Sequence, residues 1–124
     1  MHEYAMTKQI VESVIASAES HHAKKISEVY LTIGKFTYLN PEQIRFWFDL
    51  LKKDNRLLAS SKLRIKLKEG AVQCDRCGYR GKIKYVDDAL YHLMVPTLEC
   101  PRCGSIVTIV EGKECKIDSI KAVV

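Results

Sequence analysis

Two patterns in the sequence predict an α+β fold, a small mixed three-stranded sheet with two helices, into which a second domain is inserted. Apolar residues recur at helical spacing in two segments and alternate with polar residues in three others, in the order helix, strand, helix, strand, strand. The segment between the last two strands differs, because it holds four of the five cysteines. We therefore expect residues 1–70 and 112–124 to form one α/β domain and residues 71–111 to form the insertion.

The first helix is predicted over residues 4–22, and the first strand over residues 27–34. The helix is identified by an apolar stripe at helical spacing, formed by Ile10, Val11, Val14, Ile15 and Ala18. His21 and His22 close this helix, where positive charge suits the helix dipole, and we expect them to be solvated. The strand is identified by an alternation of apolar residues with Tyr30 and Thr32, the apolar ones being Val29, Leu31 and Ile33.

The second helix is predicted to begin at Pro41, because Asn40 is a good N-cap and proline suits the first helical position. We expect it to be the most buried element, since its apolar residues are Ile44, Phe46, Trp47, Phe48, Leu50 and Leu51. Residues 62–68 alternate lysine or arginine with leucine or isoleucine, which predicts a half-exposed strand with a basic outer face. A last strand, near residues 115–123, is expected to return to the first sheet.

The cysteines of the insertion form two matching motifs, Cys74-Asp-Arg-Cys77-Gly78 and Cys100-Pro-Arg-Cys103-Gly104. Each motif predicts a tight turn whose amides point at the thiolates, with a glycine that permits the turn conformation. Two such turns supply four sulfur ligands in a tetrahedron, which favours a closed, non-catalytic zinc site and a zinc-ribbon-like insertion. Four-thiolate iron, as in an electron carrier, is compatible with the same spacing. The fifth cysteine, Cys115, is expected to be a small buried residue in a strand.

The chain begins with Met1, His2 and Glu3. A free α-amine, the amide nitrogen of residue 2 and the imidazole of His2 can all reach one metal ion, and Glu3 adds an amide nitrogen and a carboxylate. Nitrogen-rich planar donor sets favour nickel(II) or copper(II). A motif this short is also compatible with an ordinary exposed terminus.

Charge is spread unevenly along the chain, with 11 lysines and arginines against 3 acidic residues between positions 52 and 84. Such a stretch indicates either a solvated face or a surface for an acidic partner. Together with Tyr79, Tyr85 and Tyr91 it leaves one alternative function open, a nucleic-acid-binding zinc-ribbon protein. The Met1-His2-Glu3 start would be an accident in that case.

Several classes of protein are disfavoured by the sequence. It contains no Gly-x-x-x-x-Gly-Lys-Ser/Thr loop and no recognisable nucleophile arrangement, so we expect no enzyme activity and no GTP hydrolysis by this chain. It has no apolar run long enough for a membrane helix and no signal-peptide pattern. We therefore expect a cytoplasmic protein without a membrane partner.

Taken together, these segments resemble the HypA/HybF family of hydrogenase maturation factors over nearly the whole chain. The resemblance is carried by the Met1-His2-Glu3 start, Ile33-Gly34, Asn40-Pro41-Glu42 with Phe46 and Phe48, both cysteine motifs, and Ile117-Asp118-Ser119-Ile120. It implies an α/β nickel-binding domain plus a zinc domain, with nickel centred on His2, Met1 and Glu3 contributing, and zinc on Cys74, Cys77, Cys100 and Cys103. Tyr4 and the basic middle depart from the common pattern, and neither change affects a ligand.

The resemblance also implies a function and partners. It implies a nickel metallochaperone that carries Ni(II) as transient cargo to the large subunit of [NiFe] hydrogenase, in some members to urease, together with a HypB-type GTPase. A homodimer is a further candidate assembly, and we expect no nucleic-acid partner. His92 has two interpretations, an ordinary core or surface histidine, or a residue that completes nickel coordination when the zinc domain folds back on the N-terminus.

Overall fold

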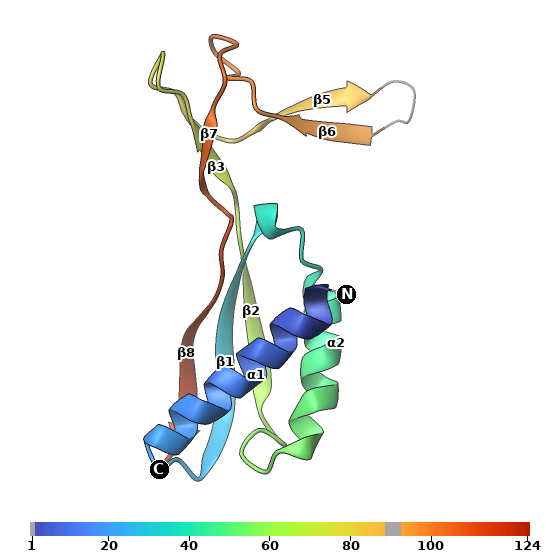
Figure 1. Cartoon of the computed structure of the whole chain (residues 1–124), viewed down its shortest axis with the longest axis vertical. Helices are drawn as coiled ribbons and strands as arrows, with labels where there is room; N and C mark the ends of the chain where they lie inside the picture. Colours follow the sequence, from blue (N-terminus) through green and yellow to red (C-terminus); the bar gives the residue numbers. More distant parts are fainter. Residues whose placement is uncertain (1, 89–92) are drawn as a thin grey trace.

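The computed structural model describes residues 2–88 and 93–124, and Figure 1 shows their arrangement. In chain order the elements are α1 (His2–Ser20), β1 (Lys25–Gly34), the 3-10 turn η1 (Lys35–Thr37), α2 (Pro41–Leu51), η2 (Lys52–Asp54), β2 (Lys62–Lys68), β3 (Ala71–Gln73), β4 (Arg80–Gly81), β5 (Lys84–Asp88), β6 (Leu93–Thr97), β7 (Thr108–Glu111) and β8 (Cys115–Val123). Within these ranges the strands form three sheets, ordered β2-β1-β8, β4-β3-β7 and β5-β6. The predicted α+β fold is confirmed.

β1 is the central strand of the main sheet and has a partner on each side. β2 runs parallel to it, with Val29 opposite Leu63, whereas β8 runs antiparallel, with Val29 opposite Ile120. A parallel pair needs a crossover connection, which α2 provides between β1 and β2. The main sheet is therefore mixed and three-stranded, and the C-terminal strand returns to it after the insertion as predicted (Figure 1).

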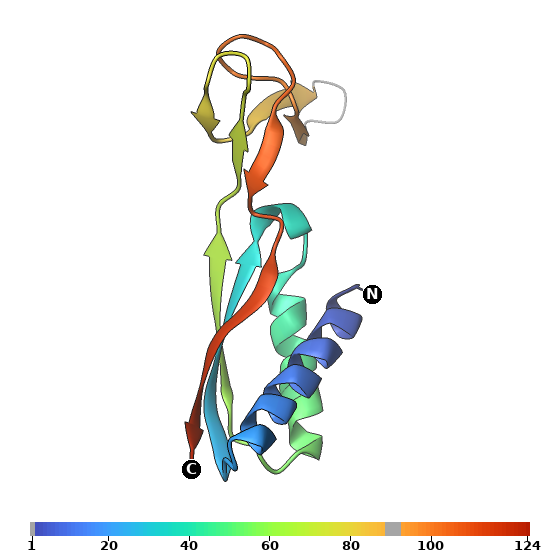
Figure 2. The ribbon, with the colours of Figure 1, turned by 60° about the vertical axis from the view of Figure 1, so that its left-hand side comes forward.

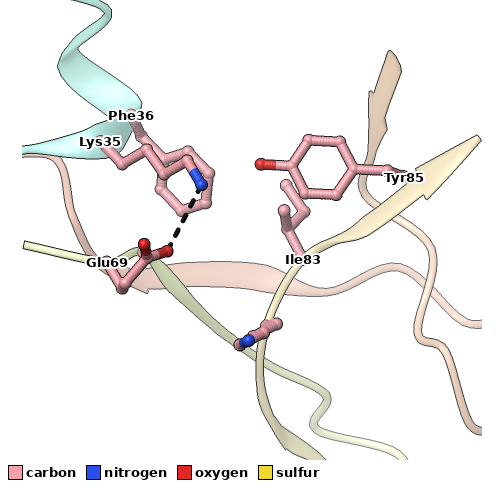
Figure 3. Close-up of a pocket in the computed structure, with 7 residues that line it drawn as sticks. Lys35, Phe36, Glu69, Ile83 and Tyr85 are labelled. Atoms are coloured by element: carbon pink, nitrogen blue, oxygen red, sulfur yellow. Dashed lines mark hydrogen bonds and ion pairs between the residues drawn. The ribbon is translucent and has the colours of Figure 1, made fainter. Parts of the chain in front are cut away.

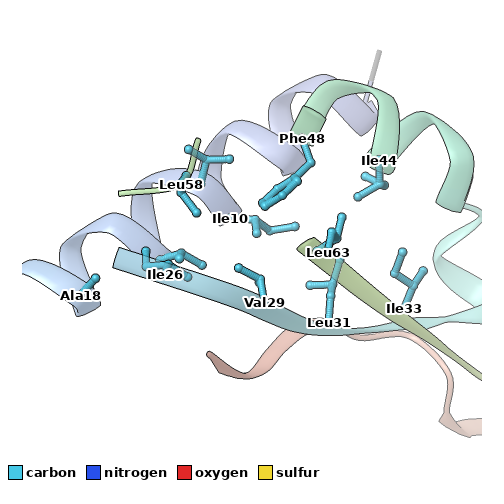
Figure 4. Close-up of a cluster of buried hydrophobic side chains, with 12 residues drawn as sticks. Ile10, Ala18, Ile26, Val29, Leu31, Ile33, Ile44, Phe48, Leu58 and Leu63 are labelled. Carbon is cyan, nitrogen blue, oxygen red and sulfur yellow. The ribbon is translucent and has the colours of Figure 1, made fainter. Parts of the chain in front are cut away.

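The main core lies between this sheet and the two helices, which cover the same face of the sheet (Figure 2). Its buried side chains come from both helices, from β1 and β2, and from the loop before β2 (Figure 4). They are Ile10, Val11, Val14, Ala18, Ile26, Val29, Leu31, Ile33, Ile44, Phe48, Leu58 and Leu63. Burying one large apolar side chain stabilises the fold by about 1.5–3 kcal/mol, so this cluster is the main source of stability for the helical part of the chain.

The prediction that the second helix is the most buried element is wrong. Ile44 and Phe48 are the buried residues of α2, whereas Phe46 is 57% and Leu50 46% exposed. β1 is buried more completely, because helices cover one of its faces and a strand flanks each edge. A helix at the surface of a domain buries only one stripe of its circumference, whatever its overall apolar content.

α1 begins two residues earlier than predicted, at His2, and ends at Ser20. His21 and His22 follow it in an exposed turn, as expected for solvated residues, and His22 has a left-handed φ of 55°. His2 therefore lies in the first turn of a helix and not in a separate extended tail. In the described part of the chain, neither helix is both long and apolar enough to cross a bilayer.

The face of the main sheet opposite the helices is polar, and Glu28 lies at the centre of its ion pairs. The Glu28 carboxylate accepts a hydrogen bond from the Tyr30 hydroxyl, and it pairs with Arg64 of β2 at 3.2 Å and with Lys121 of β8 at 3.5 Å. The hydrogen bonds from Tyr30 and then Arg64, with the charge of Lys121, lower the pKa of Glu28 to about 2. This carboxylate therefore links all three strands.

Replacing this carboxylate, as in Glu28→Gln, is expected to flatten the stability of the protein between about pH 4.5 and about pH 2. A carboxyl group whose pKa is lowered by folding stabilises the fold above its unfolded pKa. That contribution is lost as the pH falls through the folded pKa. Thermal unfolding of both proteins across this range measures the effect, and an unchanged pH profile in the variant would contradict it.

Two chain segments connect the main sheet to the insertion, one after β2 and one before β8, and glycines let them pass close together. A Cβ atom on Gly34 would lie 2.3 Å from the carbonyl oxygen of Gly112, and a Cβ on Gly70 would lie 2.0 Å from the Phe36 ring. Phe36 also packs against the apolar cluster of the insertion. Tight packing at these residues therefore fixes how the insertion joins the main sheet.

A cavity of about 240 Å³ opens beside this junction (Figure 3). Its lining includes the rings of Phe36 and Tyr85 and the ion pair between Lys35 and Glu69, whose Nζ and Oε2 atoms lie 3.4 Å apart. Lys82 also lines it. Two ammonium groups disfavour a bound metal cation, so this cavity is not a candidate metal centre.

Candidate metal centres

The two cysteine motifs fold into matching turns. In the first, the amide of Cys74 donates to the carbonyl of Tyr79 at 2.8 Å, and the amide of Gly78 donates to the carbonyl of Cys74 at 2.9 Å. The amides of Cys100 and Gly104 make the equivalent bonds in the second turn, at 2.7 and 2.9 Å. Both glycines have φ near 80°, in the left-handed region that favours glycine. The predicted tight turns are confirmed.

The sulfur atoms of the two turns meet in one cluster, and all four lie within 4.8 Å of one another. The Sγ atoms of Cys74 and Cys103 are 3.6 Å apart, and those of Cys77 and Cys100 are 3.5 Å apart. Zinc–sulfur bonds of about 2.3 Å in a tetrahedron place neighbouring sulfurs about 3.8 Å apart. The cluster is therefore compatible with four-coordinate zinc, and its cysteines are free and not joined as disulfides.

Hydrogen bonds to the sulfurs prepare this cluster for a cation. The amide of Arg102 donates to Cys100 Sγ at 3.4 Å. Hydrogen bonds from the side chain and then the backbone of Ser105 lower the pKa of Cys103 to about 6. Burial, followed by hydrogen bonds with the other three cysteines, raises the pKa of Cys77 to about 11. A thiol must lose its proton before it binds a metal, so the surroundings of Cys103 favour metal capture at neutral pH and those of Cys77 oppose it.

The segment around the cysteines has little apolar material to bury. Its buried cluster consists of Val72, Ile83 and Val107 together with Cys74 and Cys100. The strands of its sheet are two to four residues long. Chains of about 40 residues rarely fold on such a core without a metal or disulfides, so the apolar residues of this segment are a small core for its length.

The chain start is docked against the beginning of α2. His2 is exposed, while the Glu3 carboxylate accepts a hydrogen bond from the amide of Asn40 at 3.1 Å, which lowers the pKa of Glu3. Asn40 is the N-cap of α2 as predicted, because its side-chain oxygen accepts bonds from the amides of Glu42 and Gln43 at 2.9 and 3.3 Å. These contacts hold the first turn of α1 in a defined position.

Two further residues of the predicted nickel site, Met1 and His92, lie outside the described residues. The hairpin strands β5 and β6 extend toward the side of the molecule on which the chain begins (Figures 1 and 2). Of the four residues predicted to bind nickel, the structure therefore describes His2 and Glu3. The contribution of the other two stays a prediction.

A cavity of about 300 Å³ adjoins His2, and its other lining residues are Met6, Thr37, Leu39, Lys113 and Cys115. Cys115 is half-buried in β8 and packs against the main core, as the sequence predicts, and burial raises the pKa of its thiol. Its position beside His2 was not predicted. No local pattern could indicate it, because the two residues lie near opposite ends of the chain.

The basic residues between positions 52 and 84 come from several elements of the fold. They lie in η2, in the strands β2, β4 and β5, and in the segments between elements. The Tyr79 ring packs against Arg102, whose Cζ lies 5.7 Å from the ring centroid, and its hydroxyl donates to the carbonyl of Lys82 at 2.9 Å. The ring and the hydroxyl of Tyr79 are therefore both engaged in contacts within the protein. Tyr91 lies outside the described residues. The stacking platform of the nucleic-acid alternative gains no support from Tyr79.

Comparison with known proteins assigns the family. Residues 1–122 match the family described as "Hydrogenase/urease nickel incorporation, metallochaperone, hypA". The chain belongs to the HypA family. The HypA/HybF resemblance drawn from the chain start, the cysteine motifs and the C-terminal strand is therefore confirmed.

Relatives and solved structures agree with this family. The hydrogenase maturation factor HypA of Methanothermobacter thermautotrophicus is 37% identical, over 98% of this chain and 96% of its own. That of Methanopyrus kandleri is 31% identical, over 98% of this chain and 92% of its own. The solution structure of the Ni metallochaperone HypA from Helicobacter pylori shares the fold, with a TM-score of 0.67, 20% identity, and coverage of 98% of this chain and 97% of that one.

Proposed function

We propose that this protein is a nickel metallochaperone that binds Ni(II) as transient cargo at Met1, His2 and Glu3. The cargo is delivered to the large subunit of [NiFe] hydrogenase, or to urease, with a HypB-type GTPase as partner. The observation that carries the proposal is the HypA family match over residues 1–122. The exposed imidazole of His2 at the start of the chain supports the position of the site.

The first turn of α1 suits this role, because a helix leaves its first four amide groups without partners inside the helix. Since α1 begins at His2, the amide nitrogen of His2 is one of these first four groups. The Glu3 carboxylate accepts a hydrogen bond from the amide of Asn40, which holds the first turn of α1 against the start of α2. The positive end of the helix dipole opposes a bound cation, which favours a site that releases its cargo.

We propose that the four-cysteine cluster holds structural zinc. Zinc, when bound, crosslinks the two cysteine turns and leaves no open position for catalysis. The division into residues 1–70 with 112–124 and residues 71–111 is part of the same proposal, and it is supported by two separate buried clusters. His92, which lies outside the described residues, stays a proposed additional nickel donor.

The experiment that tests the proposed function is a calorimetric titration of the untagged protein with nickel, compared with the His2→Ala variant. We expect one nickel per chain in the unaltered protein and an affinity at least about 100-fold lower in the variant, more than the loss of an outer-shell partner causes. His21→Ala is the matched control, because His21 is an exposed histidine at the other end of α1. Unchanged nickel binding in His2→Ala would place the site elsewhere.

Nickel affinity is expected to fall as the pH falls below neutrality. Imidazole and amine donors bind a metal only after losing their protons, so affinity drops by about tenfold per pH unit for each proton released. Titrations at two pH values measure this slope, with zinc content determined in both samples. Equal nickel affinity at both pH values would contradict a nitrogen-donor site.

The same preparation separates the proposed function from the nucleic-acid alternative. A metallochaperone binds nickel in proportion to protein and shows no salt-dependent affinity for single-stranded DNA. A nucleic-acid-binding protein shows the reverse, with affinity that falls steeply as salt is added. We also propose a cytoplasmic location, where hydrogenase maturation would meet this chain.

A further inference from the structure

The cavity beside His2 brings together three side chains that bind soft metal ions. His2 contributes an imidazole, Met6 a thioether and Cys115 a thiol, around a volume of about 300 Å³. His2 and Met6 are one helical turn apart, so they lie on the same face of α1. Cys115 comes from the first position of β8. Sulfur ligands of these two types are suited to late transition metals.

The wall of this cavity that carries Cys115 is held in place by strand pairing and backbone hydrogen bonds. Cys115 pairs with Ile33 in the register of β8 against β1. The segment just before it is tied to the main sheet and η1, because the amide of Gly34 donates to the carbonyl of Glu114 at 2.7 Å and that of Phe36 donates to the carbonyl of Gly112 at 2.8 Å. The thiol is therefore positioned by the fold before any metal arrives.

We propose that Cys115 is an additional nickel donor, which binds the cargo through its sulfur while His2 remains attached. This inference rests on the proposed function, since it adds a sulfur donor to the nickel site at the chain start. When the nickel–sulfur bond forms, the S–H bond breaks and its proton passes to water, with no change in oxidation state. His2 then binds nickel in two alternative states. In one state the other donors are nitrogen atoms of the chain start, and in the other state they include the sulfur of Cys115.

A second coordination of nickel, which includes sulfur, would help the protein to transfer the ion. A metal that can exchange ligands one at a time moves without ever losing all of its donors, and a shared imidazole permits such an exchange. Lys113 also lines the cavity, and its ammonium group opposes a cation there. The sulfur-bound form is therefore held less tightly than three favourable donors alone would hold it, which suits cargo that must leave.

The test is spectroscopic and uses the zinc-loaded, untagged full chain titrated with nickel. Zinc thiolates do not absorb in the near ultraviolet or visible, so a new sulfur-to-nickel charge-transfer band reports a nickel–thiolate bond. We expect this band in the unaltered protein and its loss in Cys115→Ser, with nickel affinity about tenfold lower. Ile117→Val is the matched control on the same strand, and it is expected to keep both the band and the affinity.

A second measurement follows the thiol directly. With zinc on the other four cysteines, Cys115 is the remaining thiol of five. Nickel is expected to slow its alkylation by about tenfold or more, because a metal-bound thiolate is a poorer nucleophile than a free one. The protection is expected to disappear in His2→Ala, which keeps Cys115 but removes the imidazole beside it.

The outcomes distinguish this inference from the proposed function. Stoichiometric nickel binding without the band and without protection of Cys115 overturns the inference and leaves the proposed function standing. A band that survives in Cys115→Ser also overturns it, because the sulfur would then belong to another residue. Failure of the unaltered protein to bind nickel overturns both.

Discussion

Removing zinc is expected to unfold the segment 71–111 while leaving both helices and the main sheet in place. The buried cluster of this segment has three apolar side chains besides its cysteines, Val72, Ile83 and Val107. Structural zinc contributes about 10–16 kcal/mol of apparent binding free energy in small peptides, which exceeds what three such side chains can supply. The main core contains none of the four cysteine ligands and does not depend on the metal.

Amide hydrogen exchange before and after chelation measures this directly. Protection in β3 and β7 is expected to be lost, while protection in α1 and β1 is retained. Cys74→Ser is expected to reproduce the effect by removing a sulfur ligand, and Cys115→Ser is its matched control, expected to keep one zinc per chain. Persistent protection of β3 and β7 in metal-free protein would show that the segment folds on its apolar residues alone.

Phe48→Ala is expected to destabilise the helical part of the chain by about 3–5 kcal/mol. The Phe48 side chain is fully buried between α2 and the main sheet, among the residues drawn in Figure 4. Removing it withdraws a large apolar group from the core and leaves a cavity that the surrounding side chains fill only in part. Since natural domains are stable by only about 5–15 kcal/mol, this single change is expected to bring the fold close to unfolding.

Phe46→Ala is the matched control for that prediction, because it makes the same chemical change two residues earlier on the same helix. Phe46 is 57% exposed and touches Trp47, with ring centroids 5.1 Å apart. Its loss is expected to cost about 1 kcal/mol or less, the value of one exposed aromatic contact. Urea denaturation followed by far-ultraviolet circular dichroism compares the two variants, and similar losses in both would contradict the burial described for α2.

The elements of the fold and the cysteine cluster could be predicted from local patterns. The Asn40-Pro41 start of α2 depends on hydrogen bonds within four residues of the chain, so the letters specify it. The alternation in residues 62–68 assigns β2 in the same way. In the cysteine motifs, Gly78 and Gly104 indicate a backbone with positive φ, a conformation that few other residues adopt. Two turns built alike and carrying thiols need only face each other to form one cluster.

Burial could not be assigned from composition. The apolar residues of α2 suggested a helix that is buried on all sides. Which side of a helix is buried depends on the elements that pack against it, and these are known only from the structure. Phe46 and Phe48 have identical side chains and opposite exposures. β1, with fewer large residues, is buried because it was inserted between two other strands under two helices.

Relations between distant residues also emerged only from the folded chain. The Glu28 carboxylate meets Arg64 and Lys121, and His2 shares a cavity with Cys115, through strand pairings that bring remote segments together. Turns, helix caps and hydrophobic periodicities arise from interactions between residues that are close in the sequence. They can therefore be predicted from the sequence. Ion pairs across strands and shared cavities depend on how distant segments pack together, so only the tertiary structure shows that Glu28 meets Lys121 and that His2 lies beside Cys115.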